Sequence, residues 1–177
     1  MKIAIIGYSG AGKSTLAQKL SQFYSIPKLH MDTLQFQPNW QDSDRDWMKS
    51  EMKKFLTTHS DWVIDGNYSW CCYEERMEQA DQIIFLNFSP WTCLFRALKR
   101  YLTYRGKVRE SMAAGCPERF DWDFIRWILW DGRSKSAKER YKGIQETYPE
   151  KVILLRSQKE IDHFLDNLAY NKKNQRT

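Results

Sequence analysis

A short glycine-rich stretch near the N-terminus has the residue types that bind phosphate. Residues 7–14 read Gly-Tyr-Ser-Gly-Ala-Gly-Lys-Ser and match G-x-x-x-x-G-K-S/T at every fixed position. Glycines let backbone N–H groups point inward at a phosphate chain, and a helix beginning near Lys13 adds its positive end. We expect Lys13 to reach the β- and γ-phosphates of ATP and the Ser14 hydroxyl to bind Mg²⁺. The predicted nucleotide-binding residues are Gly7, Ser9, Gly10, Ala11, Gly12, Lys13, Ser14 and Thr15.

The alternative interpretation of this stretch is a glycine-rich turn that happens to precede a lysine. A β-branched run over residues 2–6 precedes the loop, and apolar residues at helical spacing follow it over residues 13–24. This strand–loop–helix context is the one that the phosphate-binding motif requires. Guanine specificity is disfavoured, because the nearest string of the guanine-recognising type, residues 171–174 (Asn-Lys-Lys-Asn), lacks the aspartate.

Two aspartates follow predicted strands. Asp32 and Asp65 therefore should lie at the carboxyl edge of a parallel sheet, beside the glycine-rich loop. Either carboxylate can hold a water of the Mg²⁺ shell or accept a proton from an acceptor hydroxyl. We assign Asp32 to the acceptor hydroxyl and Asp65, with Ser14, to the metal; the alternative for each aspartate is a helix cap or a turn. His30 should point to the other face of its strand, as a packed core histidine.

Arginines supply the remaining candidates for catalysis. Arg96 and Arg100 are four residues apart on a predicted helix and so share a face. Arginines that close over phosphates stabilise the transferring group, so Arg100 and Arg133 are predicted catalytic residues; a solvated basic stripe is the alternative. Three further arginines recur every seven residues on one long predicted helix, so they would share a second face: Arg126, Arg133 and Arg140. The same helix carries three tryptophans, for which we favour packing in the core or in a lid over base stacking: Trp122, Trp127 and Trp130.

Composition excludes several classes of protein. The 177 residues are 42% apolar and 28% charged, which favours one globular domain over residues 1–177 and argues against disorder. No apolar run approaches the roughly 20 residues of a membrane helix, and no signal peptide is recognisable, so we expect a cytoplasmic protein without a membrane partner. The four cysteines form no C-x-x-C pair and are expected to be reduced. Residues 91–145 hold 13 Lys and Arg against 6 Asp and Glu, which indicates an anionic partner.

Strand and helix patterns alternate along the chain. The predicted strands cover residues 2–6, 27–31, 62–64, 82–88 and 152–155. The predicted helices cover residues 13–24, 43–58, 70–79, 90–104, 121–145 and 160–170. Ser43 is the expected cap of the second helix, whose inner stripe would be Trp47, Met48, Met52, Phe55 and Leu56. Residues 105–120 are expected to form a loop or an excursion of short helices, and residues 171–177 a frayed tail. Such alternation predicts a parallel sheet between layers of helices.

The order of these motifs resembles that of the adenylate-kinase-like P-loop kinases, and more closely that of bacterial proteins labelled DNA topology modulation (FlaR-like) proteins. The resemblance spans residues 1 to about 156 and rests on residues 30–32, 65–68, 96–105 and 112–121, beside the loop. It implies a nucleoside-monophosphate-kinase-like, three-layer α/β fold with a five-stranded parallel sheet of order 2-3-1-4-5. It further implies a lid over residues 105–133, Arg96 near the adenine and Arg100 near the phosphates.

The chain departs from adenylate kinase where that enzyme holds the phosphate of its acceptor. The corresponding stretches here, residues 33–36 (Thr-Leu-Gln-Phe) and 67–69 (Asn-Tyr-Ser), carry no cation. AMP would then lack its bidentate partners unless Arg76 or a lysine substitutes. The surroundings better suit a hydroxylated small molecule, as in the shikimate- and gluconate-kinase relatives, and the neighbours that indicate this are Gln35, Phe36, Trp40, Asn67 and Tyr68.

Two functions of different classes follow. The first is an ATP- and Mg²⁺-dependent phosphotransferase that acts on an unidentified small molecule, as a monomer or homodimer. The second is a nucleotide-switched nucleic-acid-binding protein that modulates DNA topology. Nucleic acid is the less favoured partner, because a kinase lid accounts for the same positive charge and the sequence carries no helix-turn-helix, zinc module or RNP-type motif.

Overall fold

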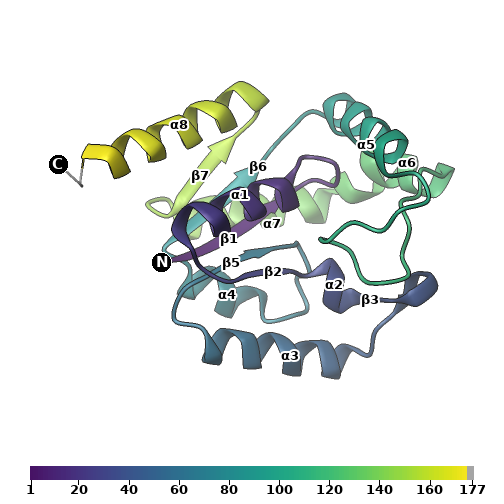
Figure 1. Cartoon of the computed structure of the whole chain (residues 1–177), viewed down its shortest axis with the longest axis horizontal. Coiled ribbons are helices and arrows are strands. Elements are labelled where there is room, and N and C mark those ends of the chain that lie inside the picture. Colours follow the sequence, from purple (N-terminus) through teal and green to yellow (C-terminus); the bar gives the residue numbers. More distant parts are fainter. Residues whose placement is uncertain (175–177) are drawn as a thin grey trace.

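A five-stranded parallel sheet forms the centre of the protein, in a computed structural model that describes residues 1–174 (Figure 1). Its strands are β1 (Lys2–Gly7), β2 (Lys28–His30), β5 (Trp62–Asp65), β6 (Gln82–Leu86) and β7 (Val152–Leu155). Their order across the sheet is β2-β5-β1-β6-β7, and all neighbours are parallel. Counted along the chain, this order is the predicted 2-3-1-4-5, so the predicted fold class is confirmed.

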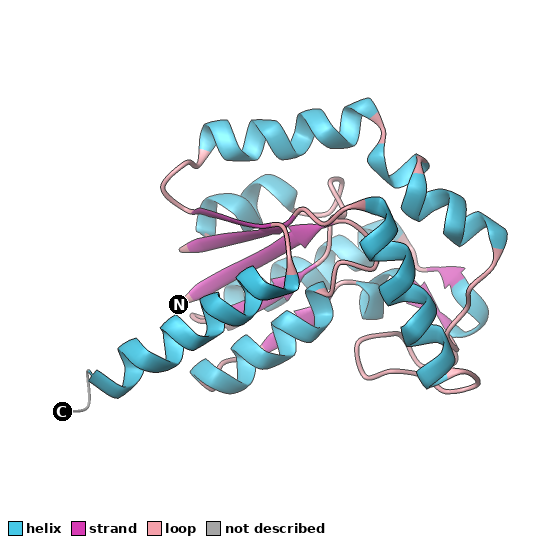
Figure 2. Cartoon of the chain, turned by 90° about the horizontal axis from the view of Figure 1, so that it is seen from above, coloured by secondary structure: helices cyan, strands magenta, loops and turns pink. Residues whose placement is uncertain are grey.

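Helices cover both faces of the sheet (Figure 2). They are α1 (Lys13–Tyr24), α3 (Arg45–Thr58), α4 (Tyr73–Gln79), α5 (Pro90–Tyr104), α6 (Trp122–Leu129), α7 (Lys135–Thr147) and α8 (Gln158–Asn174). Residues 3–6 and 83–86 of the two central strands are buried on both sides, as expected of parallel strands between helical layers. On one face, Tyr141 of α7 stacks on Phe85 of β6, with ring centroids 4.4 Å apart.

The long helix predicted over residues 121–145 is two helices. Helix α6 ends at Leu129, a single 3-10 turn covers Asp131–Arg133, and α7 begins at Lys135. The hydroxyl of Ser134 accepts a hydrogen bond from the backbone N–H of Ala137, so this serine caps a new helix. The predicted common face of Arg126, Arg133 and Arg140 is therefore wrong, because the break changes the direction of the chain between them.

The chain between β2 and α3 contains short elements that the sequence did not predict. A one-turn helix α2 (Asp32–Gln35) leads into a small antiparallel hairpin of β3 (Phe36–Gln37) and β4 (Gln41–Asp42), with a 3-10 turn at Pro38–Trp40 between them. Two-residue strands are too short to produce a period in the sequence. They nevertheless direct Phe36 and Trp40 toward the carboxyl edge of the sheet.

Several predicted helix ends and faces are wrong. Asp44, not Ser43, caps α3, since its carboxylate accepts from the N–H of Trp47 at 2.8 Å. Trp47 is 46% exposed and lies outside the inner stripe of that helix. Helix α4 begins at Tyr73 rather than at residue 70. Helix α8 continues through Asn174, so residues 171–174 are not frayed, and the rest of the predicted tail lies outside the described residues.

Contacts with α1 explain why α8 extends so far. The ammonium of Lys172 donates to the carbonyl of Phe23 and lies 4.4 Å from the centre of its ring. Tertiary packing therefore overrides the polar composition of this segment. No helix within residues 1–174 has both the length and the hydrophobicity needed to cross a lipid bilayer.

Candidate functional site

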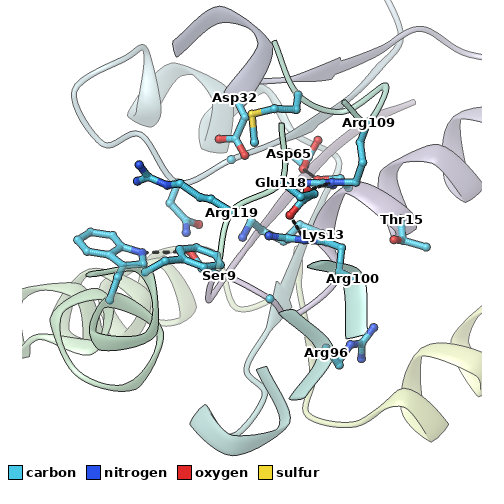
Figure 3. Close-up of a pocket in the computed structure, with 18 of the residues that line it drawn as sticks. Ser9, Lys13, Thr15, Asp32, Asp65, Arg96, Arg100, Arg109, Glu118 and Arg119 are labelled. Atoms are coloured by element: carbon cyan, nitrogen blue, oxygen red, sulfur yellow. Dashed lines mark hydrogen bonds and ion pairs between the residues drawn. The ribbon is translucent and has the colours of Figure 1, made fainter. Parts of the chain in front are cut away.

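A cavity of about 1250 Å³ lies at the carboxyl edge of the sheet (Figure 3). Its wall includes the glycine-rich loop, the ends of β2 and β5, one side of α5 and the loop over residues 105–121 that connects α5 to α6. Pockets for one small ligand usually measure about 300–1,000 Å³. This cavity therefore has room for a nucleotide and a second small molecule together.

The glycine-rich loop has a backbone that only glycine accommodates. Gly10 and Gly12 have φ angles of 80° and 98°, in the left-handed region. A Cβ at Gly10 would lie 2.5 Å from the carbonyl oxygen of Cys93, and one at Gly12 would lie 2.6 Å from the guanidinium of Arg96. The loop is thus packed closely against α5 and has no space for side chains at these positions.

The side chain of Lys13 folds back onto the first residues of the loop. Its Nζ donates to the carbonyls of Gly7 at 3.0 Å and Tyr8 at 3.2 Å. Burial lowers the pKa of Lys13, and the charges of Asp32 and Asp65 oppose that shift. A phosphate oxygen is a stronger acceptor than a carbonyl for this ammonium, so Lys13 is positioned to bind phosphate.

The other predicted loop residues divide into two groups. Ser9, Gly10, Gly12, Lys13, Ser14 and Thr15 line the cavity. Gly7 and Ala11 belong to the loop but do not line the cavity. The hydroxyl of Ser9 accepts a hydrogen bond from the indole N–H of Trp127 at 3.1 Å, which joins the loop to α6.

Asn67 fixes the first residue of the loop, a role that the sequence analysis missed. Its side-chain oxygen accepts from the N–H of Gly7 at 3.0 Å, and its amide nitrogen donates to the carbonyl of Gly7 at 2.6 Å. The sequence suggested Asn67 only as a neighbour of the acceptor. A signal was present, because Asn67 follows Asp65-Gly66 at the end of a strand that parallel pairing places beside β1.

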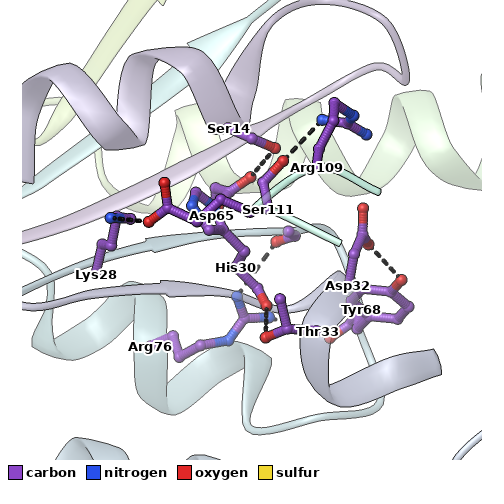
Figure 4. A network of polar contacts seen from close by, with 12 residues as sticks. Ser14, Lys28, His30, Asp32, Thr33, Asp65, Tyr68, Arg76, Arg109 and Ser111 are labelled. Carbon is purple, nitrogen blue, oxygen red and sulfur yellow. Dashed lines mark hydrogen bonds and ion pairs between the residues drawn. The ribbon is translucent and has the colours of Figure 1, made fainter. Parts of the chain in front are cut away.

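Asp65 joins the loop to β2 (Figure 4). One of its carboxylate oxygens accepts from the Ser14 hydroxyl at 2.9 Å, and the other contacts Nδ1 of His30. His30 and Asp65 are partners in the register of β2 and β5, which explains the contact. His30 is buried, as predicted, but it pairs with a carboxylate of the site instead of packing among apolar side chains.

Ser14 and Asp65 are hard oxygen donors of the kind that Mg²⁺ prefers, and the two fit that ion. Within residues 1–174 there is no cluster of three or more His, Cys, Asp or Glu side chains that could hold a metal on its own. A cation at Ser14 and Asp65 would complete its shell with phosphate oxygens and water. Magnesium binds in this manner in phosphoryl-transfer sites.

Asp32 lies across the cavity from the loop and has a different environment. Its carboxylate accepts from the hydroxyl of Tyr68 at 2.6 Å. Burial raises the pKa of Asp32, while the hydrogen bond from Tyr68 acts in the opposite direction. Burial also raises the pKa of Tyr68, and the negative charge of Asp32 adds to that effect. This carboxylate is therefore more basic than an ordinary aspartate and faces the cavity.

The two arginines predicted to share a face of one helix, Arg96 and Arg100 of α5, both line the cavity. Arg96 lies over the ring of Phe88, 4.8 Å from its centre, beside Gly12 and in the same wall as Gln158 at the start of α8. Arg100 donates through Nε to Glu118 at 2.9 Å. Glu118 and its second partner, Arg109, also line the cavity, and the sequence analysis did not select either.

Arg133 is not among the residues that line the cavity. Its guanidinium lies 3.7 Å from the centre of the Tyr8 ring and donates to the carbonyls of Ile128 and Phe88. These contacts connect α6 to Tyr8 of the glycine-rich loop and to Phe88. The geometry therefore favours a structural role over the predicted catalytic one. Arg126 and Arg140 line the cavity instead, and Arg126 pairs with Asp131 at 2.9 Å.

The tryptophans of α6 and the following turn are more exposed than a packing role predicts. The exposed fractions are 69% for Trp122, 49% for Trp127 and 59% for Trp130. Trp127 lines the cavity through its contact with the glycine-rich loop. These exposures contradict core packing for the three side chains, whereas packing within a lid stays a prediction.

The part of the cavity around Asp32 is aromatic. Phe36, Trp40, Tyr68 and Trp70 line it, and the rings of Phe36 and Trp40 meet edge to face at 5.2 Å. Gln35, which the sequence also suggested, donates to Asp42 and does not line the cavity.

Arg76 does not reach this cavity. It is fully buried and donates to the carbonyls of Gly66 at 3.2 Å and Tyr68 at 3.1 Å. Burial lowers the pKa of Arg76 to about 10. Its guanidinium supports the loop that carries Asn67 and Tyr68. Arg76 therefore does not take the place of the arginines that hold the acceptor's phosphate in adenylate kinase, and that possibility raised from the sequence is wrong.

Comparison with solved structures places this architecture among known folds. A gluconokinase from Sinorhizobium meliloti 1021 superposes with a TM-score of 0.51 at 16% identity, over 98% of this chain and 94% of that one. A shikimate kinase from Bacteroides thetaiotaomicron gives 0.51 at 18% identity, over 98% of each chain. A deoxyadenosine kinase from M. mycoides, with the products dCMP and dCDP bound, gives 0.50 at 17% identity, over 96% of this chain and 100% of that one.

The fold is that of the nucleoside-monophosphate-kinase-like P-loop proteins. At these identities the likeness establishes the fold alone. No protein-family model and no curated protein sequence matches the chain.

Proposed function

We propose that the protein is an ATP- and Mg²⁺-dependent phosphotransferase that moves the γ-phosphoryl group to a hydroxyl of a small molecule without a phosphate of its own. The observation that carries this proposal is one cavity with two chemically distinct sides. The phosphate-binding loop with Lys13 occupies one side, and the Asp32–Tyr68 pair between aromatic side chains occupies the other. An ATP-binding protein that acts only as a switch has no need of the second side.

Each side has a definite role in this reaction. The loop N–H groups and Lys13 hold the phosphate chain. Arg96, which lines the cavity together with Gln158 of α8, lies near the adenine, as the family resemblance implies. Bound at Ser14 and Asp65, Mg²⁺ supplies charge neutralisation for the phosphates. Asp32 accepts the proton of the attacking hydroxyl, for which a raised pKa is an advantage. Arg100 balances charge on the transferring group.

The arginines near the acceptor side already have partners, and this favours an acceptor that carries no phosphate. Arg76 is buried away from the cavity and is bound to backbone carbonyls. Arg119 lies 4.6 Å from the centre of the Trp40 ring and pairs with Asp121 at 3.5 Å. A phosphorylated acceptor would have to compete for these groups, whereas a hydroxylated one needs only Asp32 and the aromatic wall.

We also propose that residues 105–133 act as a lid. They carry several of the cavity's cations and connect to the rest of the fold through the ends of α5 and α7. If they close over bound nucleotide, MgATP should slow tryptic cleavage at the exposed Arg105 and Lys107. Lys13→Ala should remove that protection, and equal cleavage with and without MgATP would argue against the lid.

The competing proposal is a nucleotide-switched DNA-binding protein, in line with the FlaR-like resemblance. The observation that favours it is the group of exposed aromatic and basic side chains within residues 91–145. Such side chains can stack on bases and contact phosphates.

The decisive experiment measures ATP consumption with Mg²⁺ against nucleosides, nucleoside monophosphates, sugars, sugar acids and duplex DNA. We expect one hydroxylated, phosphate-free molecule to stimulate turnover. Lys13→Ala should reduce that rate by at least about 100-fold, as the loss of one transition-state donor does elsewhere. Lys142→Ala, at an exposed lysine of α7, is the matched control and should leave the rate unchanged. Stimulation by DNA alone would replace this proposal with the competing one, and stimulation by AMP would refute a phosphate-free acceptor.

A further inference from the structure

Glu118 is a buried carboxylate in the wall of a cavity built for phosphate. Its side chain is 4% exposed and bonds two arginines from different segments. Oε2 accepts from Nε of Arg100 on α5 at 2.9 Å, and Oε1 accepts from Nε of Arg109 in the 105–121 loop. In Figure 3 the carboxylate of Glu118 lies between these two side chains.

Glu118 uses only the Nε atom of each arginine. The terminal nitrogens of Arg100 are therefore left to bind another anion. Nη1 of Arg109 donates to the hydroxyl of Ser111 at 2.7 Å, which holds this guanidinium from a second direction. The ring of Phe124 lies 5.7 Å from the guanidinium carbon of Arg100 and restricts it further. Both arginines thus have defined orientations before any ligand binds.

The two arginines lie next to the groups expected to handle the phosphoryl group. Both line the cavity together with Lys13 and Asp32. The positive charge of Arg100 contributes to the lowered pKa of Lys13, and that of Arg109 opposes the raised pKa of Asp32. The Glu118 cluster, defined here as Arg100, Arg109, Ser111 and Glu118, therefore adjoins the space between the phosphate-binding loop and the acceptor side.

A negative charge in this place is unfavourable for a phosphate ligand unless it serves another purpose. Ionised carboxylates are rarely buried, and this one also repels the anion that the cavity is expected to bind. We propose that Glu118 is a positioning residue that orients Arg100 and Arg109 toward the phosphate chain. The inference rests on the proposed function only in taking the cavity to bind a polyphosphate.

Positioning and simple charge balance predict opposite results for Glu118→Gln. If Glu118 only offsets positive charge, removing its charge strengthens the binding of any anion. If it orients the two arginines, the uncharged amide holds them less well, and anion binding weakens although the cavity has become more positive. The sign of the change in affinity therefore separates the two explanations.

The test measures the Kd of inorganic tripolyphosphate by calorimetry at constant ionic strength, so that screening is equal for all variants. We expect Glu118→Gln to raise this Kd about 5-fold or more, and Glu118→Asp, which keeps the charge, to recover part of the loss. Glu146→Gln is the matched control, because Glu146 pairs with Lys142 on the exposed side of α7. An unchanged or lower Kd for Glu118→Gln would overturn the proposal.

Ser111→Ala provides a second variant in case Glu118→Gln does not fold. It removes one hydrogen bond to Arg109 and changes no charge, and we expect it to raise the same Kd about 3-fold. Wild-type affinity in Ser111→Ala, with Glu118→Gln unfolded, would contradict the positioning role.

The kinetic measurement uses the acceptor found by the decisive experiment. Glu118→Gln should lower kcat by about 10- to 100-fold and change the KM of the acceptor little, since misplacement of a catalytic group by about 1 Å can cost 100-fold. Equal kcat in the variant and the wild type would overturn the role in transfer. Failure of the proposed function gives a different pattern, in which the wild type binds tripolyphosphate but transfers no phosphoryl group.

Discussion

At the scale of single residues, the site separates two aspartates that look alike in the sequence. Asp65 is surrounded by donors, the hydroxyl of Ser14 and the ring of His30. Among residues 1–174, only the hydroxyl of Tyr68 donates a hydrogen bond to the carboxylate of Asp32, and burial raises the pKa of Asp32. The first environment suits a carboxylate that contributes an oxygen ligand to a cation, and the second suits one that takes up a proton. Environment rather than residue type therefore assigns the roles.

Asp32→Asn should lower the catalytic activity and raise the thermal stability at and above neutral pH. A carboxyl whose pKa is raised in the folded state contributes stability below its unfolded pKa, and that contribution is lost as the pH rises through the folded pKa. The neutral amide avoids this loss, so the variant should have the higher Tm at pH 7–8 and a Tm close to wild type near pH 3. Its kcat should fall by about 100-fold or more.

Thermal unfolding followed between pH 3 and pH 8 checks the stability of Asp32→Asn. Asp46→Asn, at an exposed aspartate of α3, is the control and should show no such trend. A Tm for Asp32→Asn at or below wild type at pH 8 would mean that Asp32 is not destabilised by burial.

Asn67→Ala should weaken both the fold and ATP binding. The variant removes both hydrogen bonds to the backbone of Gly7, and the two groups lose their partners at a cost of about 1–3 kcal/mol in the free energy of unfolding. Urea unfolding and ATP titration measure the two effects. Asn167→Ala, an exposed asparagine of α8, is the matched control. An unchanged ATP Kd in Asn67→Ala would show that Asn67 does not set the shape of the loop.

At the scale of elements, the break between α6 and α7 positions the basic side chains of the cavity. A continuous helix would carry Arg126 and Arg133 on one face, whereas the turn at Asp131–Arg133 sends Arg133 behind the loop and leaves Arg126 on the cavity wall. Gly132 permits this turn, because a Cβ there would lie 2.9 Å from the carbonyl oxygen of Trp127.

Two glycine-to-alanine variants should have opposite effects on stability. Gly132→Ala forces a shift against Trp127 and should cost about 1–3 kcal/mol in the free energy of unfolding. Gly143→Ala, in the middle of α7 with open space around it, should gain about 0.5–1 kcal/mol. Urea denaturation measures both values. A stabilised Gly132→Ala would mean that the turn does not depend on glycine.

At the scale of the whole molecule, the basic segment over residues 91–145 is distributed around the cavity. Arg96 and Arg100 reach the cavity from α5, Arg109 and Arg119 from the connecting loop, and Arg126 from α6. The charge excess recognised in the sequence is therefore concentrated where the fold leaves space for anions. Ligand binding should then couple segments far apart in the chain.

Nucleotide binding should consequently stabilise the entire protein. At 100 times its Kd, a ligand adds about 2.7 kcal/mol to the folded state. For a chain of this size, that corresponds to a Tm increase of about 5–10 °C, measured with a non-hydrolysable ATP analogue and Mg²⁺. Lys13→Ala should remove most of the increase, and Lys142→Ala should keep it. A shift that survives in Lys13→Ala would place the nucleotide elsewhere.

The sequence alone determined the features that depend on local pattern. The spacing of Gly7, Lys13 and Ser14 located the loop, and the alternation of strands and helices, with the family resemblance, predicted the sheet and its order. Asp32 and Asp65 were found because each follows a predicted strand, and parallel strands end at the same edge. These inferences need no knowledge of which side chains touch.

Only the tertiary structure decided the contacts between distant segments. The register of β2 and β5 joined His30 to Asp65, and the fold of the 105–121 loop brought Glu118 to Arg100. Arg76 is buried away from the cavity and so cannot bind a phosphate there. The break between α6 and α7 places Arg133 away from the cavity wall. Register, burial and ion pairing depend on packing between elements far apart in the chain, whereas periodicity and spacing record only the neighbourhood of each residue.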